Sequence, residues 1–184
     1  MPELLAACVV RELRRDSGSV GVTAIDKAPV PGPVRVGPFG LRSDVQADRK
    51  YHGGLEQAVY AYAQEDAEYW SAELGRELAP GWFGENLRVS GLDVNGARIG
   101  ERWRIGTDEK SVVLEVTGPR SPCQTFARWV GGSDERGWVK RFSDAGRLGA
   151  YFRVVQRGRI AAGDPIEIIH TPETTLTVLG MYRG

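Results

Sequence analysis

The chain has 184 residues, a length that fits one domain with or without a short appendage. Hydrophobic residues make up 41% of it, enough for a core that needs neither a metal nor disulfide bonds. Lys and Arg together number 24, as do Asp and Glu, so the formal net charge is zero. Because nucleic-acid-binding proteins usually carry a basic excess, this balance argues against a nucleic-acid partner.

The N-terminus and the cysteines indicate the cellular compartment. The apolar run from Leu4 to Val10 is short, follows no basic segment and is ended by Arg11, so it matches neither a signal peptide nor a membrane span. Two cysteines, Cys8 and Cys123, are too few for a disulfide framework. We therefore expect a cytoplasmic protein with two free thiols and no membrane contact.

Most of the chain alternates short apolar runs with turns, as β-strands do. The strands do not alternate regularly with helices, which argues against a doubly wound parallel sheet. About eight to ten strands with two helices predict a mainly β domain, best described as a mixed β-barrel. The proline-rich segment 28–33 is expected to be a loop or a sheet edge. Strands are expected at residues 4–10, 20–25, 34–36, 58–62, 87–89, 101–105, 111–116, 150–156 and 165–169.

Two segments carry helical signals. The first, residues 64–78, has an acidic first turn and an apolar stripe that includes Trp70, which we expect in the core. A proline-glycine sequence follows and should end this helix. The second helix is expected to begin at Ser133 or Asp134 and to end near Ala145, before a glycine.

Cys123 is the first candidate for chemistry. It follows a strand-like run and a turn that one glycine and two prolines interrupt, and it precedes the helix-like segment 124–129. This order would hold a reactive group at the edge of a sheet. A thiolate is the reactive form, and a nearby cation such as Arg120 favours it. The alternative is a small buried hydrophobic side chain, which is the reading we expect for Cys8 within its apolar strand.

The segment between residues 40 and 62 is unusually rich in polar side chains. Within it, Gly53 and Gly54 allow the backbone to turn and to approach a ligand closely. An ordinary polar loop would show the same pattern, and a histidine in it would usually be only solvated. The candidate ligand-binding side chains of this segment are Asp44, Gln46, Asp48, His52 and Gln57.

An acid-amide pair, Glu85 and Asn86, is the last candidate. It follows two aromatic residues and a glycine and leads directly into the strand at 87–89. These two side chains could line a pocket or merely bond their own turn.

Taken together, five motifs resemble the MOSC domain, the C-terminal domain of molybdenum cofactor sulfurases, and in particular its stand-alone YiiM-like subgroup. The resemblance spans roughly residues 4–170, so we expect a MOSC domain over 1–170 and a short tail over 171–184 that looks like the start of a helical extension. Ser43 departs from the glycine that relatives often have. The motifs are Asp44-x-Gln46-x-Asp48, His52-Gly53-Gly54, Gln57-Ala58-Val59, Phe83-Gly84-Glu85-Asn86-Leu87 and Arg120-Ser121-Pro122-Cys123.

The resemblance implies a β-rich barrel that binds the molybdenum cofactor (molybdopterin), with no pyridoxal phosphate. It makes Cys123 the thiolate ligand of molybdenum. It makes His52 either a proton donor or a residue that contacts the metal ligands without binding the metal. YiiM-like members are associated with the reduction of N-hydroxylated compounds, a detoxification that would draw electrons from a redox partner protein. The residues that would shape the cofactor pocket are Asp44, Gln46, Gly53, Gly54, Gln57, Glu85, Asn86 and Arg120.

Two other functions fit the same residues. Cys123 could hold the cofactor or a persulfide for delivery, which would make the protein a carrier without turnover. It could also act with His52 as the nucleophile of a hydrolase. No residue pattern that would orient such a histidine is visible, so the hydrolase is the weaker alternative.

Overall fold

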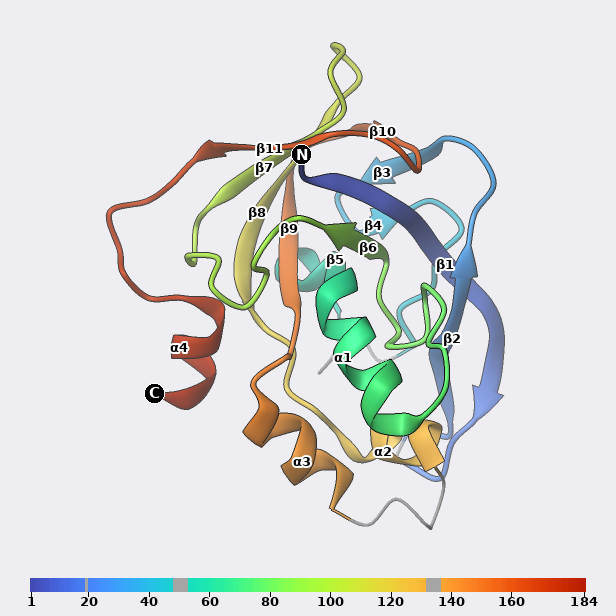
Figure 1. Ribbon diagram of the computed structural model, residues 1–184. Coiled ribbons are helices and arrows are strands. Elements are labelled where there is room, and N and C mark those ends of the chain that lie inside the picture. The colour runs from blue at the N-terminus through green and yellow to red at the C-terminus, as the bar shows by residue number, and fades with distance from the viewer. Residues whose placement is uncertain (19, 48–52, 132–136) are drawn as a thin grey trace.

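The computed structural model describes residues 1–18, 20–47, 53–131 and 137–184 (Figure 1). The helices in these residues are η1 (Leu55–Gln57, a 3-10 helix), α1 (Gln64–Leu74), α2 (Gln124–Gly131), α3 (Trp138–Ala145) and α4 (Val178–Arg183). The strands are β1 (Glu3–Arg15), β2 (Val22–Pro29), β3 (Val34–Gly37), β4 (Gly40–Leu41), β5 (Val59–Ala63), β6 (Leu87–Ser90), β7 (Arg102–Ile105), β8 (Val112–Pro119), β9 (Ala150–Gln156), β10 (Gly158–Ile160) and β11 (Ile166–His170).

The strands form two sheets. Eight strands pair in the order β11-β7-β8-β9-β5-β6-β1-β2, and three more pair in the order β10-β3-β4. Neighbouring strands are antiparallel except β5 and β6, which are parallel. The proline-rich end of β2 lies on the edge strand of the large sheet, because a strand without all its N–H groups can occupy only that position.

The prediction of a mainly β domain is confirmed, but the prediction of a barrel is wrong, since neither sheet closes among the described residues. The start of β1 does approach the segment before β11, where the Leu4 N–H donates to the Asp164 carbonyl at 2.9 Å. This contact remains a single bridge between Glu3 and Pro165. The Ile166 N–H adds one more bond, to the Pro2 carbonyl at 2.9 Å, but the second half of β1 pairs with β2 instead.

Two hydrophobic clusters lie on opposite faces of β5, whose five residues are all buried. The first joins the two sheets and contains aliphatic side chains such as Val34 of β3 and Leu114 of β8. The second is aromatic and packs the helices onto the sheet; it includes Trp70 of α1, as the sequence predicts. A strand buried on both faces reads as a continuous apolar run, which explains why segment 58–62 is recognisable without alternation.

The helices differ from the prediction mainly at their ends. α1 stops at Leu74 rather than residue 78, because Gly75 adopts a left-handed conformation with φ of 63° and donates its N–H to the Ala72 carbonyl. The predicted start of the second helix lies outside the described residues, whereas its end at Ala145 is confirmed. The short helix α2, directly after Cys123, matches the helix-like segment 124–129.

The tail carries α4, which the sequence indicates only as the beginning of an extension. Its Val178 is fully buried in the first cluster and donates its N–H to the Ala97 carbonyl at 2.9 Å. Tyr182 packs against the second cluster and shares a hydrogen bond of 2.6 Å with the Ser143 hydroxyl. The tail therefore contacts both hydrophobic clusters.

Val178→Ala tests how much this packing stabilises the protein. Removing two buried carbons should lower the free energy of unfolding by roughly 2 kcal/mol, from lost burial and the resulting cavity. For a chain of this size the melting temperature should fall by about 4–8 °C in a calorimetric scan. Val155→Ala, at a site that is 46% exposed, is the matched control and should change it little. Equal melting temperatures for the two variants would show that α4 adds no stability.

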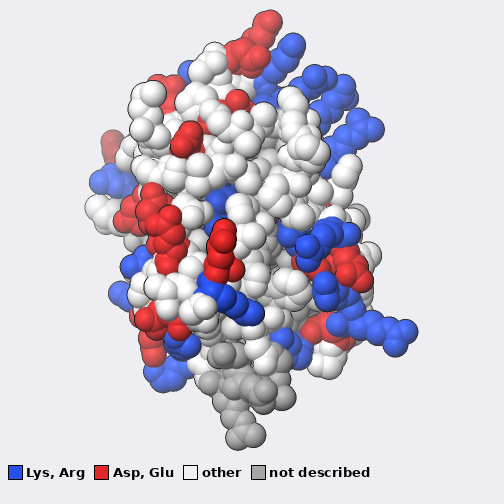
Figure 2. Space-filling model, turned by 45° about the vertical axis from the view of Figure 1, so that its right-hand side comes forward, with Lys and Arg blue, Asp and Glu red and all other residues white. Residues whose placement is uncertain are grey.

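Surface charge is mixed, as the balanced composition requires. Figure 2 shows acidic and basic side chains spread over one face, with a gathering of basic side chains at its upper right. Within the described part of the chain, no helix combines the length and the apolar character needed to cross a membrane.

Candidate functional site

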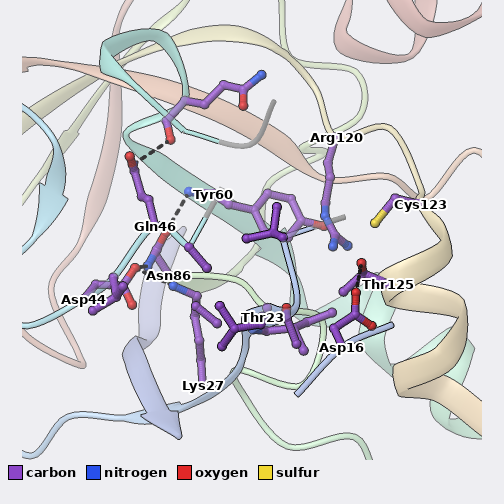
Figure 3. A pocket seen from close by; sticks show the side chains of 18 of the residues that line it. Asp16, Thr23, Lys27, Asp44, Gln46, Tyr60, Asn86, Arg120, Cys123 and Thr125 are labelled. Atoms are coloured by element: carbon purple, nitrogen blue, oxygen red, sulfur yellow. Dashed lines mark hydrogen bonds and ion pairs between the residues drawn. The ribbon is translucent and has the colours of Figure 1, made fainter. Parts of the chain in front are cut away.

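A cavity of about 320 Å³ lies where β2, the segment after β4, β5 and the start of α2 meet. Figure 3 shows its two ends: Asp44, Lys27, Asn86 and Gln46 at one, and Arg120, Cys123, Thr125 and Asp16 at the other. The remaining lining residues are Gly18, Val20, Val22, Thr23, Ala24, Ile25, Val45, Ala47, Gln57, Tyr60, Gly84 and Tyr151.

Cys123 and Arg120 face the same part of this cavity (Figure 3). The Cys123 thiol is free and half-buried, and the residue's carbonyl accepts the Ala127 N–H at 3.1 Å, which fixes the residue at the N-terminus of α2. Arg120 is only 8% exposed, yet its Nη1 has no hydrogen-bond partner among the described residues. A buried guanidinium N–H without a partner is costly, which makes this donor a candidate contact for a bound ligand.

Aromatic rings hold the Arg120 guanidinium in place. Its Cζ lies 5.2 Å from the centre of the Tyr60 ring and 4.7 Å from that of Phe126, within the range of cation–π contacts. Burial by itself lowers the pKa of Arg120, but the neighbouring Tyr60, Tyr151 and Cys123 raise it above its ordinary value. The cavity therefore contains a fixed positive charge next to the thiol.

The opposite end is a buried network around Asp44. One carboxylate oxygen accepts the Val10 N–H at 2.8 Å; the other pairs with the Lys27 ammonium and accepts the Asn86 side-chain amide at 2.7 Å. Asn86 in turn accepts the Tyr60 N–H at 3.1 Å. These bonds tie three strands and the segment after β4 together. Asp44 and Asn86 therefore stabilise the cavity wall and also line the cavity.

Gln46 holds the loop before η1. Its side-chain oxygen accepts the Gly54 N–H at 3.0 Å, and its nitrogen donates to the Gln57 carbonyl at 3.3 Å. Gly54 has φ of 87°, a conformation that favours glycine and explains one of the two consecutive glycines. The Gln57 side-chain oxygen is buried and has no partner in the described residues, so it is a second unsatisfied polar atom in the cavity wall.

Glu85 does not line the cavity, although the sequence groups it with Asn86. It is fully buried, accepts the Gly81 and Phe83 N–H groups at 2.8 and 2.9 Å, and pairs with Arg88. Its carboxylate thus bonds its own turn, which is the second of the two roles that the sequence allows for this motif. Asp48 and His52, which the sequence also singles out, lie outside the described residues, and neither Gly53 nor Gly54 lines the cavity.

Several lining residues carry no sequence signal. Lys27 is one of four lysines in a chain of 20 arginines, a rarity that could have drawn attention to it. Tyr60 and Tyr151 belong to apolar strands and read as core residues. Tyr151 is half-buried, and the loss of water around its phenol raises the pKa of that group, although Arg120 opposes the shift. Asp16 follows β1 and reaches the cavity only because the β1–β2 hairpin folds against α2.

Asp16 connects that hairpin to α2. Its carboxylate accepts the Thr125 hydroxyl at 2.9 Å and the Arg128 Nε at 2.8 Å. The hydrogen bond from Arg128 is the main reason that the pKa of Asp16 falls from 3.8 to about 2. A carboxylate with a lowered pKa stabilises the fold above its unfolded pKa, and that stabilisation disappears as acid protonates it.

Asp16→Asn should therefore show a pH-dependent loss of stability. Urea unfolding at pH 7 should give a free energy at most about 2 kcal/mol below that of the unchanged protein, since the lowered pKa corresponds to that energy. The difference should persist above about pH 5 and shrink as the pH falls from 4 towards 2. A difference that stays constant across this range would mean that the carboxylate charge is irrelevant.

The other thiol, Cys8, is separate from this chemistry. It is fully buried in β1, and burial, followed by the nearby Glu85 charge, raises its pKa to about 12. The prediction of a structural Cys8 is confirmed.

Comparisons with known proteins place the chain in a family. A profile described as the MOSC domain matches residues 48–167, more than half of the chain. YflK of Bacillus subtilis (strain 168) is 35% identical over 156 residues, which cover 85% of this chain and 67% of YflK. A protein named reductase from Gibberella moniliformis is 32% identical over 183 residues, or 95% of this chain but only 31% of that longer protein.

A solved structure agrees with these matches. The crystal structure of YiiM from Geobacillus stearothermophilus superimposes with a TM-score of 0.77 at 27% sequence identity, covering 100% of this chain and 83% of that one. The resemblance predicted from the five motifs is therefore confirmed, and the chain belongs to the MOSC domain family, with the YiiM proteins among its relatives.

Proposed function

We propose that this protein binds the molybdenum cofactor in the cavity, with Cys123 as the molybdenum ligand, and reduces N-hydroxylated compounds. The single observation that carries the proposal is the free Cys123 thiol beside the buried guanidinium of Arg120, whose Nη1 has no hydrogen-bond partner among the described residues. A thiolate is a soft ligand suited to a transition metal, and a guanidinium suits an anionic group.

The cavity meets the chemical demands of such a cofactor. Molybdopterin carries a phosphate and a polar pterin ring, so it needs a cation and hydrogen-bonding partners as well as a sulfur ligand. Arg120 offers a free N–H with a positive charge, and Gln57 offers a free carbonyl oxygen. Both unsatisfied atoms belong to residues that line the same 320 Å³ cavity as Cys123. A bound cofactor would satisfy polar atoms that have no partner in the described part of the chain.

Reduction of an N-hydroxylated compound breaks its N–O bond, consumes two electrons and two protons, and releases water. The cofactor, when bound, would supply the two-electron redox chemistry. The chain itself would bind and orient the reactants: Arg120 holds an anionic group, and Tyr60 and Tyr151 exclude water around that charge. Because burial raises the pKa of Tyr151, its phenol stays protonated at neutral pH and is available as a hydrogen-bond donor.

The relative named a reductase supports an enzyme over a cofactor carrier. This chain corresponds to only 31% of that protein, so any region that delivers electrons there has no counterpart in the match. The proposal accordingly includes a separate redox partner as the electron source.

The test is to express the protein in a host supplied with molybdate and to measure molybdenum and pterin per chain. The purified protein is then assayed for reduction of an N-hydroxylated purine with reduced methyl viologen as electron donor. We expect about one molybdenum per chain and formation of the amine. Cofactor without turnover would identify a carrier, and protein that binds neither molybdenum nor pterin would refute the proposal.

A further inference from the structure

Three arginines form a row across the small sheet, away from the cavity already described. Arg159 of β10 and Arg35 of β3 are direct partners in the antiparallel ladder. The Arg42 N–H, just after β4, donates to the Arg35 carbonyl at 2.8 Å and continues the row on the other side of β3. All three side chains are exposed, on the side opposite to the buried Val34 and Val36.

This row has no acidic counterpart. None of the three arginines forms an ion pair with a described carboxylate, although other exposed arginines such as Arg104 and Arg141 do. Residues that face each other across an antiparallel ladder have Cα atoms about 5 Å apart, and like charges there destabilise the sheet. The fold therefore keeps positive charges together at a cost in stability, which a bound anion would offset.

The row borders a cleft of about 310 Å³. Its apolar side chains come from Val9, Val30 and Pro33, and its polar groups come from the three arginines and Ser43; Val34 also borders it, although the Val34 side chain is buried in the core. No acidic side chain of the described residues lines it. An apolar wall with a few convergent polar groups is the usual composition of a small-molecule site.

Ser43 adds a second unusual feature to this cleft. It has φ of 74° and is the only described residue other than glycine with a positive φ. Its hydroxyl is a further hydrogen-bond donor on the cleft wall. The next residue, Asp44, belongs to the cavity, so the same turn borders both sites.

We propose that this cleft binds a small molecule through a phosphate or diphosphate group. Guanidinium groups match phosphate oxygens in geometry and charge, and three neighbouring cations favour a multiply charged anion over a single carboxylate. The apolar wall gives an organic body attached to the phosphate a surface to pack against. The proposal does not depend on cofactor binding in the cavity.

The test is a titration of the uniformly 15N-labelled protein with inorganic pyrophosphate at constant ionic strength, followed by NMR. We expect saturable shifts of the amide signals of β3, β4 and β10. Arg35→Gln/Arg159→Gln should weaken binding at least about tenfold, since it removes two charge-assisted contacts. Arg104→Gln/Arg141→Gln, which removes the same charge elsewhere, is the matched control and should bind as the unchanged protein does.

Three further arms sharpen the result. Phenyl phosphate should bind more tightly than inorganic phosphate if the apolar wall takes an organic body, whereas equal affinity would assign the site to free phosphate groups. Ser43→Gly, which suits the positive φ, should weaken binding without loss of stability. Cys123→Ser should bind pyrophosphate normally, which separates this proposal from the function of the cavity.

Unsaturable shifts, equal affinity for malonate, or undiminished binding by the Arg35/Arg159 variant would each overturn the proposal.

Discussion

Cys123→Ser is expected to abolish molybdenum retention and to leave the free energy of unfolding nearly unchanged. The thiol is half-buried on the cavity wall and makes no side-chain hydrogen bond to the described residues that a serine would break. A hydroxyl is a hard, largely protonated group and a poor substitute for a thiolate as ligand of a transition metal. Elemental analysis of the purified variant measures retention, and urea unfolding measures stability.

The matched control is the same substitution at the other cysteine. Cys8→Ser puts a hydroxyl into a fully buried site of β1, so it should lower stability by about 1–3 kcal/mol and leave molybdenum content alone. Iodoacetamide at neutral pH should likewise modify Cys123 in cofactor-free protein well before Cys8, which is buried and has a pKa of about 12. Stoichiometric molybdenum in Cys123→Ser, or faster modification of Cys8, would refute the role of Cys123.

The sequence predicts this site well wherever chemistry and local turns define it. Asp44, Gln46, Gln57, Asn86, Arg120 and Cys123 all line the cavity, and the last three stand directly beside a proline or a strand end. Such positions are recognisable because a polar side chain at a fixed turn has few structural roles. Their roles in cofactor binding and metal ligation stay predictions.

Residues that reach the cavity through tertiary pairing are not predictable in this way. Lys27 lies within β2 and meets Asp44 only because β2 pairs with β1 and the segment after β4 folds beside them. Asp16 reaches α2 through the length of the β1–β2 hairpin, and β1 extends to Arg15, well beyond the apolar run that marks it in the sequence. The barrel prediction fails for a related reason, since closure depends on whether two distant edges complete a ladder.

Glu85 and Asn86 show how adjacent residues with the same sequence signal diverge. The turn at residues 81–84 directs the Glu85 carboxylate back to its own N–H groups and to Arg88, while the Asn86 amide reaches Asp44 and Tyr60 at the cavity. Composition alone does not distinguish the two orientations. The energetic consequences of removing each side chain should differ accordingly.

Glu85→Ala should be among the most destabilising single changes in this protein. It leaves Arg88, which is fully buried, without its carboxylate partner at 2.9 Å, and it frees the Gly81 and Phe83 N–H groups. Breaking a buried ion pair from one side lowers the free energy of unfolding by about 3–5 kcal/mol. We expect a melting temperature at least about 6 °C lower, measured by circular dichroism.

A double-mutant cycle separates this structural role from a role in ligand binding. Glu85→Leu/Arg88→Met replaces both charges by apolar groups of similar size and should recover much of the stability lost in Glu85→Ala, because no uncompensated charge remains. The exposed Glu56→Ala is the control for loss of a carboxylate, since its ion pair with Arg153 spans 3.8 Å at the surface and should contribute less than about 1 kcal/mol. If Glu85→Ala instead melts like the unchanged protein and only loses molybdenum, then Glu85 acts in the cavity and its pairing with Arg88 is not what the fold depends on.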